Sequence, residues 1–264
     1  MFEASSSPSG RPADVPAVMP TRNEPTSTEE SRIDQSPQVV VLGCGFDTLY
    51  FQMLNTMELS TDVRYVECDF PDVVKAKQSI IEGLQSGTST AGISLDRYSL
   101  IGADLRDVDG LMKKLEEVGV RQDAPTFFLA ECVLVYMDVK YSNALLQRLS
   151  SDFRSAMCVV YEQVNPNDRF GQQMMLNLRA RGCPLKGVLG SLEAQRLRML
   201  QCGWKDARSE NLLRLFNKCI PKDDIYRINR IEMMDEEEEW KLLLQHYSIT
   251  TARNNSIPHF LGVL

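Results

Sequence analysis

The chain has 264 residues, of which 43% are hydrophobic and 25% are charged, and its formal net charge is −7. This length suffices for one large α/β domain with a full core. The isoelectric point near 5.1 argues against a nucleic-acid surface built on bulk charge. The only histidines, His246 and His259, leave almost no material for a zinc site or a histidine-based triad, so we expect no metal.

The cysteines and the lack of long apolar runs indicate the cellular compartment of the protein. Seven cysteines, an odd number without a Cys-x-x-Cys pair, are typical of reduced thiols in the cytoplasm. No apolar run reaches the roughly 18 residues of a membrane helix, and the Ser/Pro-rich N-terminus has no apolar signal core. We predict a cytoplasmic protein without membrane contact, in which residues 1–37 are a disordered tail and residues 38–264 form the folded domain.

Residues 39–47, Val-Val-Val-Leu-Gly-Cys-Gly-Phe-Asp, are the most informative stretch. The apolar run predicts a buried parallel strand, and Gly43 and Gly45 let the backbone turn sharply and approach a ligand. The pattern is G-x-G-x-D, and the acid Asp47 suits an ammonium group better than a pyrophosphate. The amino-acid end of S-adenosyl-L-methionine is such a ligand. A tight turn in some other α/β protein remains the alternative.

The next two strands each lead into an acid. A helix over 48–54 and a strand over 63–67 precede Asp69, which suits ribose hydroxyls but could instead cap the helix that starts near Asp72. After a loop over 83–96, a strand over 98–102 leads to Asp104 and Leu105. There a carboxylate could accept from an adenine amino group and the leucine could cover the ring. The alternative is again a helix cap, because Asp107 and Asp109 precede an amphipathic helix over 111–118, although Asp104 itself lies before the cap position.

The middle of the chain continues the alternation of strands and helices. A strand over 125–130 runs into Glu131, which should face a polar crevice because a carboxylate is costly in the core. A helix over 139–153, a strand over 156–161 and a helix over 172–181 follow. Five such alternations predict a doubly wound, parallel α/β sheet.

The last third has a different pattern. We predict a helix over 191–201, an edge strand over 204–209, a helix over 212–216, a helix opened by the acids 235–239, and a final strand over 246–252. In that strand His246 is interpreted as a partly buried edge residue and not as a catalyst. Four acids, Asp47, Asp69, Asp104 and Glu131, thus follow four successive strands. They suit a ligand with an amine, a ribose and an adenine but no phosphate.

Five segments together resemble the leucine carboxyl methyltransferases. They are residues 41–48 (VLGCGFDT), 66–71 (VECDFP), 101–107 (IGADLRD), 130–137 (AECVLVYM) and 161–171 (YEQVNPNDRFG). The resemblance implies a doubly wound, mostly parallel seven-stranded sheet of the class I S-adenosyl-L-methionine-dependent type. It also implies methylation of the C-terminal leucine carboxylate of the protein phosphatase 2A catalytic subunit, with contacts to the cofactor from Gly43, Asp69, Asp104, Leu105 and Glu131.

The same resemblance implies an acceptor site. Tyr136 would lie near the methyl group, and the substrate tail would run past residues 168–171. Tyr136 is the first candidate to hold the spare carboxylate oxygen and Arg169 the second. For Tyr136 the alternative is a core phenol, and for Arg169 it is an ion pair with Asp168 or Glu162. We expect a monomer.

Family members carry a basic Arg-Gly-Tyr-like segment before the first strand, which closes over the cofactor. The 37 residues before the strand here hold only Arg11, Arg22 and Arg32 in a Pro/Ser-rich context, so we expect that lid to be missing. One alternative is therefore a relative that binds cofactor or phosphatase without efficient turnover. A second is another acceptor, either a small carboxylic acid or a tRNA base, the latter disfavoured by the acidic isoelectric point. A nicotinamide oxidoreductase is disfavoured because the third glycine of its motif is lacking.

Overall fold

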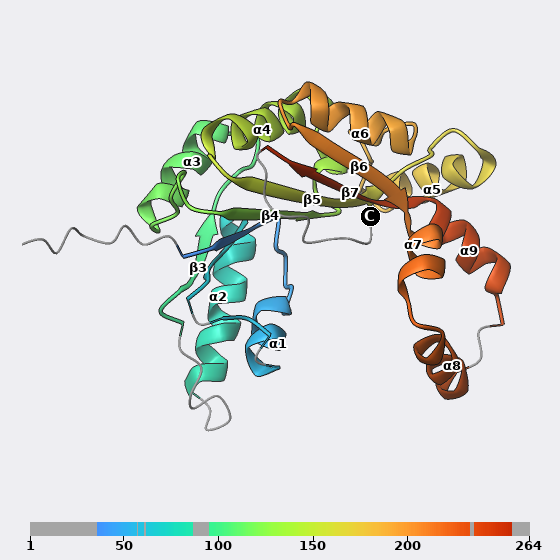
Figure 1. Ribbon diagram of the computed structural model, residues 1–264, viewed down its shortest axis with the longest axis horizontal. Helices are drawn as coiled ribbons and strands as arrows, with labels where there is room; N and C mark the ends of the chain where they lie inside the picture. The colour runs from blue at the N-terminus through green and yellow to red at the C-terminus, as the bar shows by residue number, and fades with distance from the viewer. Residues whose placement is uncertain (1–35, 57, 61, 87–94, 233–234, 255–264) are drawn as a thin grey trace, which may run out of the picture. The chain divides into compact units, whose positions relative to one another are not determined.

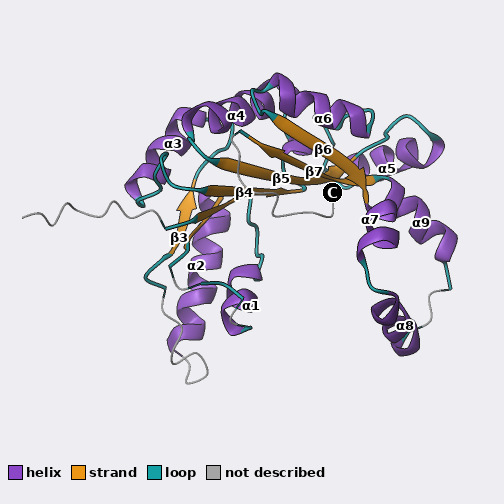
Figure 2. Ribbon diagram, viewed as in Figure 1, coloured by secondary structure: helices purple, strands orange, loops and turns teal. Residues whose placement is uncertain are grey.

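A computed structural model describes residues 36–254 except 57, 61, 87–94 and 233–234, so residues 1–35 of the predicted tail over 1–37 lie outside the described residues. Seven described strands form one sheet in the order β3-β2-β1-β4-β5-β7-β6 (Figures 1 and 2). Their bounds are β1 Gln38–Leu42, β2 Arg64–Asp69, β3 Tyr98–Gly102, β4 Thr126–Glu131, β5 Ala156–Gln163, β6 Asp206–Asn211 and β7 Tyr247–Arg253.

The strand directions confirm a mostly parallel sheet. Strands β1 to β5 pair in parallel, whereas β7 is antiparallel to both β5 and β6. In the register, Leu42 at the end of β1 pairs with Cys68 and with Ala130, and Asp69 pairs with Gly102. Because these strands are parallel and in step, the segments that follow β1, β2, β3 and β4 leave the sheet at one edge.

The helices lie where the alternation predicts them, with a few differences. Their bounds are α1 Leu49–Asn55, α2 Pro71–Ser86, α3 Val108–Glu117, η1 Leu134–Tyr136 (a 3-10 turn), α4 Val139–Asp152, α5 Arg169–Ala180, α6 Leu192–Gln201, α7 Leu212–Cys219, α8 Lys222–Ile231 and α9 Glu237–Gln245. Helix α2 extends to Ser86, into the stretch predicted as a loop. Helix α8 was not predicted because its polar, weakly hydrophobic sequence buries none of its side chains.

One face of the sheet carries the main core. Helices α3, α4 and α6 cover this face (Figure 1). Leu115 of α3, Leu146 of α4 and Met199 of α6 belong to one cluster with Val40 and Phe128 of the strands, and each of these side chains is at most 1% exposed. Such close burial of large apolar side chains is the main source of stability for the fold.

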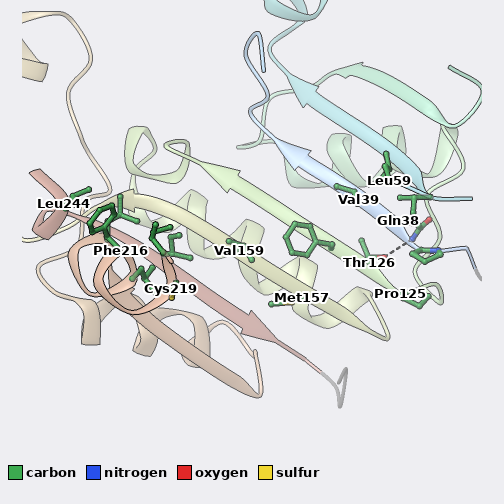
Figure 3. A pocket seen from close by; sticks show the side chains of 17 residues that line it. Gln38, Val39, Leu59, Pro125, Thr126, Met157, Val159, Phe216, Cys219 and Leu244 are labelled. Carbon is green, nitrogen blue, oxygen red and sulfur yellow. Dashed lines mark hydrogen bonds between the residues drawn. The ribbon is translucent and has the colours of Figure 1, made fainter. Parts of the chain in front are cut away.

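The opposite face is covered unevenly. Helix α1 packs a smaller cluster, with Tyr50 and Tyr65, against the β1–β2 end of the sheet. Along β4 and β5 buried residues alternate with half-buried ones such as Phe127 and Met157. These half-buried side chains line an apolar groove of about 970 Å³ that extends from Gln38 and Pro125 to Leu244 (Figure 3). No helix in the described part of the chain fills this groove, which we call the apolar groove.

The prediction for His246 as a partly buried edge residue is wrong. His246 is only 2% exposed and ends α9, while β7 lies inside the sheet between β5 and β6. The Nδ1 of the His246 ring donates to the Leu242 carbonyl at 2.8 Å, and Nε2 lies within hydrogen-bond distance of the Asp168 carboxylate, at 2.9 Å. The antiparallel return of β7 through the sheet buries the residue, which local sequence patterns cannot reveal. The predicted edge strand is confirmed, because β6 is the last strand of the sheet.

Candidate functional site

A cavity of about 330 Å³ opens at the carboxyl ends of β1, β2, β3 and β4. Its walls bring together segments that lie far apart in the sequence. The lining residues are Gly43, Gly45, Asp69, Phe70, Ala103, Asp104, Leu105, Arg106, Cys132, Val133, Tyr136, Met137, Asp138 and Lys186. The volume falls in the range of small-molecule sites, and open α/β sheets bind their ligands at this edge.

The glycine turn after β1 forms one wall of this cavity. Gly43 has φ +73°, and a Cβ there would lie 2.6 Å from a methyl group of Val133, so no other residue fits without a shift. The amides of Gly43 and Cys44 donate to the carbonyl of Cys68 at 2.7 and 3.1 Å. Gly45 has φ +49° and open space where a Cβ would be. The turn is therefore held against β2 while its second glycine stays open to the cavity.

Asp69 joins the two walls formed by β1 and β2. One carboxylate oxygen accepts from the Gly45 amide at 2.7 Å, and the other accepts from the Phe70 amide at 2.7 Å. Helix α2 begins only at Pro71, so neither of these bonds caps an amide within that helix. A carboxylate can accept further hydrogen bonds, and this one lines the cavity, so it remains available to a ligand hydroxyl.

Asp104 and Leu105 lie on the wall formed after β3. Both Asp104 oxygens accept from the Arg106 guanidinium, at 2.9 Å from Nε and 2.6 Å from the terminal nitrogen, and this pairing lowers the pKa of the Asp104 carboxyl. Leu105 is 7% exposed and supplies apolar surface. The cap of α3 is Asp107, whose side chain accepts from the Gly110 amide at 3.1 Å. Asp104 therefore lies before the cap position, as the sequence analysis expected, and does not cap this helix.

Tyr136 lies on η1, the turn that follows β4. It lines the cavity and is 40% exposed, so the alternative of a core phenol is wrong. Partial burial is the main cause that raises the pKa of the Tyr136 phenol, and the electrostatic effect of the nearby Cys132 is the second. The phenol therefore stays protonated at neutral pH. Cys132, the residue after β4, has φ +50°, an uncommon conformation for a side-chain-bearing residue, and this redirects the chain into the turn.

A buried carboxylate that the sequence analysis named only as a candidate partner of Arg169 supports this turn. Glu162 of β5 is fully buried and accepts from the Val135 amide at 2.9 Å. Its other oxygen lies 3.3 Å from the guanidinium of Arg198, which is 4% exposed and also donates to Gln195 at 2.9 Å. Burial raises the pKa of the Glu162 carboxyl, and Arg198 opposes that rise. Two features of the sequence pointed to Glu162: it follows an apolar strand, and it lies in the segment 161–171 that resembles the family.

The loop over 184–190 contributes Lys186, which the sequence analysis also missed. The next residue, Gly187, donates its amide to the Val135 carbonyl at 2.8 Å. A Cβ on Gly187 would lie 2.5 Å from the Met137 carbonyl oxygen, so glycine permits this close approach. The loop is thereby fixed beside η1, and the lysine it carries lines the cavity.

Three predicted site residues do not line the cavity. Asp47 accepts from the Leu49 amide at 3.0 Å at the start of α1. Glu131 is exposed at the end of β4, so it avoids the core as predicted, but it does not face the cavity. Arg169 is exposed in the first turn of α5, and the acids proposed to pair with it have other partners. Asp168 binds His246, and Glu162 binds Arg198.

The strand order, the antiparallel β7 and a cavity behind a glycine turn define an α/β protein of the class I methyltransferase fold. The sequence profile of the family named Leucine carboxyl methyltransferase matches residues 27–150. Leucine carboxyl methyltransferase 1 of Bos taurus is 38% identical over 231 residues, which cover 81% of this chain and 69% of the relative. The Leucine carboxyl methyltransferase 1 homolog of Arabidopsis thaliana is 36% identical over 236 residues, which cover 84% of this chain and 70% of the relative. The chain therefore belongs to the leucine carboxyl methyltransferase family.

Other similarities are broader. The tRNA wybutosine-synthesizing protein 4 of Rattus norvegicus is 36% identical over 234 residues, which cover 83% of this chain but 34% of that protein. Among solved structures, human N-acetylserotonin methyltransferase in complex with SAM aligns with a TM-score of 0.47 at 12% identity, over 84% of this chain and 49% of that chain. No helix within the described residues has the length and apolar character required to cross a membrane.

Proposed function

We propose that this chain transfers a methyl group from S-adenosyl-L-methionine to the C-terminal leucine carboxylate of the protein phosphatase 2A catalytic subunit, as a cytoplasmic monomer. Membership of the family supports the reaction class. The observation that carries the proposal is the convergence of a glycine turn, carboxylates and a phenol on one cavity.

The donor set of the cavity fits this cofactor. Three carboxylates line it, those of Asp69, Asp104 and Asp138, against the two cations Arg106 and Lys186. Leu105 and Val133 add apolar surface suited to a purine ring. An acid-rich wall favours a cationic ligand and disfavours a pyrophosphate, which binds bare amides at a helix start. By this fit, Gly43, Gly45, Asp69, Asp104 and Leu105 would hold the cofactor.

When bound, S-adenosyl-L-methionine would supply an electrophilic methyl group on a positively charged sulfur, which keeps the electron pair of the broken carbon–sulfur bond. A C-terminal carboxyl titrates near pH 3.5 and is already ionised at neutral pH, so no residue of the chain has to remove a proton. The work left to the protein is alignment of the attacking oxygen and exclusion of water. Tyr136 would donate its phenolic hydrogen to the spare oxygen of the acceptor.

The test is transfer of a labelled methyl group to a short peptide that ends in leucine with a free carboxylate. We expect transfer to this peptide and none to the same peptide with a C-terminal amide. Tyr136→Phe should lower the rate about ten-fold or more while leaving cofactor affinity, measured by calorimetry, unchanged. Near-normal turnover by this variant would remove Tyr136 from the site.

Two other outcomes correspond to the alternatives. Cofactor binding without transfer to any acceptor would identify a relative that binds without turnover. Transfer to tRNA in place of the peptide would favour the second alternative, which the similarity to tRNA wybutosine-synthesizing protein 4 motivates. Including tRNA and the peptide as acceptors in the same assay separates these cases.

A further inference from the structure

The cations around the cavity are not equivalent. Arg106 and Lys186 are the two basic side chains among its lining residues. Both Asp104 oxygens accept from the Arg106 guanidinium, which is thereby largely neutralised. The Lys186 side chain forms no hydrogen bond or ion pair with any residue that the structure describes. Its ammonium group is therefore the cation at this site that is available to a ligand.

The position of Lys186 is built into the fold. Its neighbour Gly187 is tied to η1 by the 2.8 Å hydrogen bond to the Val135 carbonyl, in a contact too close for a Cβ. On the preceding side Leu185 is 4% exposed, and two residues after Gly187 Leu189 forms a parallel bridge with Val164 of the segment after β5. The backbone around Lys186 is thus fixed against the turn that carries Tyr136.

We propose that Lys186 and Tyr136 together form the binding site for the carboxylate of the methyl acceptor. This inference rests on the proposed function and names the residue that selects an anionic acceptor. The phenol can donate one hydrogen bond to a carboxylate oxygen, and the ammonium group pairs with the charge and can donate up to three more. Methylation converts the carboxylate to a neutral ester, so the product loses this charge pairing and is released more readily.

The step conserves atoms and charge. One carboxylate oxygen forms a bond to the methyl carbon while the bond from that carbon to sulfur breaks, and no proton is transferred. Lys186 touches the acceptor and takes no proton. Its predicted effect is therefore on acceptor affinity and KM, whereas Tyr136, which in the proposed function aligns the acceptor through its spare oxygen, affects kcat as well.

The experiment measures peptide binding by calorimetry in the presence of S-adenosylhomocysteine, which cannot donate a methyl group. Two short peptides that end in leucine are compared, one with a free carboxylate and one with a C-terminal amide. Wild-type protein should bind the acid at least ten-fold more tightly than the amide. Lys186→Met should abolish this preference, and Lys186→Arg should retain most of it.

A matched control removes the same charge elsewhere. Lys113 of α3 is 78% exposed and does not line the cavity, so Lys113→Met should leave the preference unchanged. Circular dichroism confirms that each variant is folded. A Lys186→Met variant that still prefers the acid would overturn the proposal, as would a wild type that binds both peptides equally or binds neither. Loss of the preference in Lys186→Met, together with no methyl transfer by wild type, would keep the carboxylate site and reject the proposed function.

Discussion

The buried pair between Glu162 and Arg198 offers the sharpest test of how the site is supported. Glu162→Gln keeps an acceptor for the Val135 amide but removes the negative charge next to a guanidinium that is 4% exposed. Two unit charges 3.3 Å apart attract with about 5 kcal/mol at an effective dielectric constant of about 20. Breaking one side of a buried pair usually costs about 3–5 kcal/mol. Because the hydrogen bond from the Val135 amide can survive in Glu162→Gln, we expect the free energy of unfolding to fall by about 3 kcal/mol, at the low end of this range.

Urea denaturation followed by circular dichroism measures this loss. The double variant Glu162→Gln/Arg198→Met should recover at least half of it, because the unpaired buried charge is then gone. Glu193→Gln, which breaks the exposed pair between Glu193 and Arg196 on the same helix, is the control and should leave the denaturation midpoint unchanged. If the losses of the two single variants simply add in the double variant, the charges do not stabilise each other and the reasoning is refuted.

Three further predictions follow from single contacts. Gly43→Ala should destabilise the protein by about 1–3 kcal/mol more than Gly45→Ala in urea denaturation, because both have positive φ but only the first meets Val133; equal losses would contradict this. Phe128→Ala should cost about 3–5 kcal/mol and Phe127→Ala less than half as much, because Phe128 is fully buried and Phe127 lines the open groove; similar costs would mean that the groove is filled in solution. The Gly171 amide and then His246 lower the pKa of Asp168, so the stability that its carboxylate provides is present above pH 4 and is lost as pH falls below that value. The gap in melting temperature between wild type and Asp168→Asn should therefore shrink from pH 5 to pH 2.5, and a constant gap would reject this assignment.

The sequence was sufficient to locate the strands because most of them are apolar and are bounded by Gly, Pro or Asp, whereas the place of β7 between β5 and β6 was not predictable from local patterns. Local patterns also identified Gly43, Asp69 and Asp104, since each lies at or just after the end of a strand and these strands end at the same edge. Tyr136 was identified by the resemblance to the family. These patterns could not show which residues the chain brings to that edge from elsewhere. Lys186 reaches the cavity through a contact made by Gly187, and a flanking lysine carries no periodic signal.

The errors have the same origin. His246 and Asp168 are 78 positions apart, and their contact depends on the antiparallel return of β7. The four acids were expected to line one crevice. The turn after β1 directs Asp47 to the start of α1, and Glu131 is exposed and does not line the cavity. The direction of a side chain after a strand depends on the turn that follows, and that turn is set by tertiary contacts such as the one between Glu162 and Val135.

The apolar groove has a practical consequence for the purified protein. In the part of the chain that the structure describes, half-buried side chains of β4 and β5 expose part of their apolar surface to solvent in this groove. Exposed apolar surfaces of this kind bind other hydrophobic surfaces. The protein should therefore be retained on a phenyl column more strongly than its acidic composition indicates, and a mild detergent should elute it.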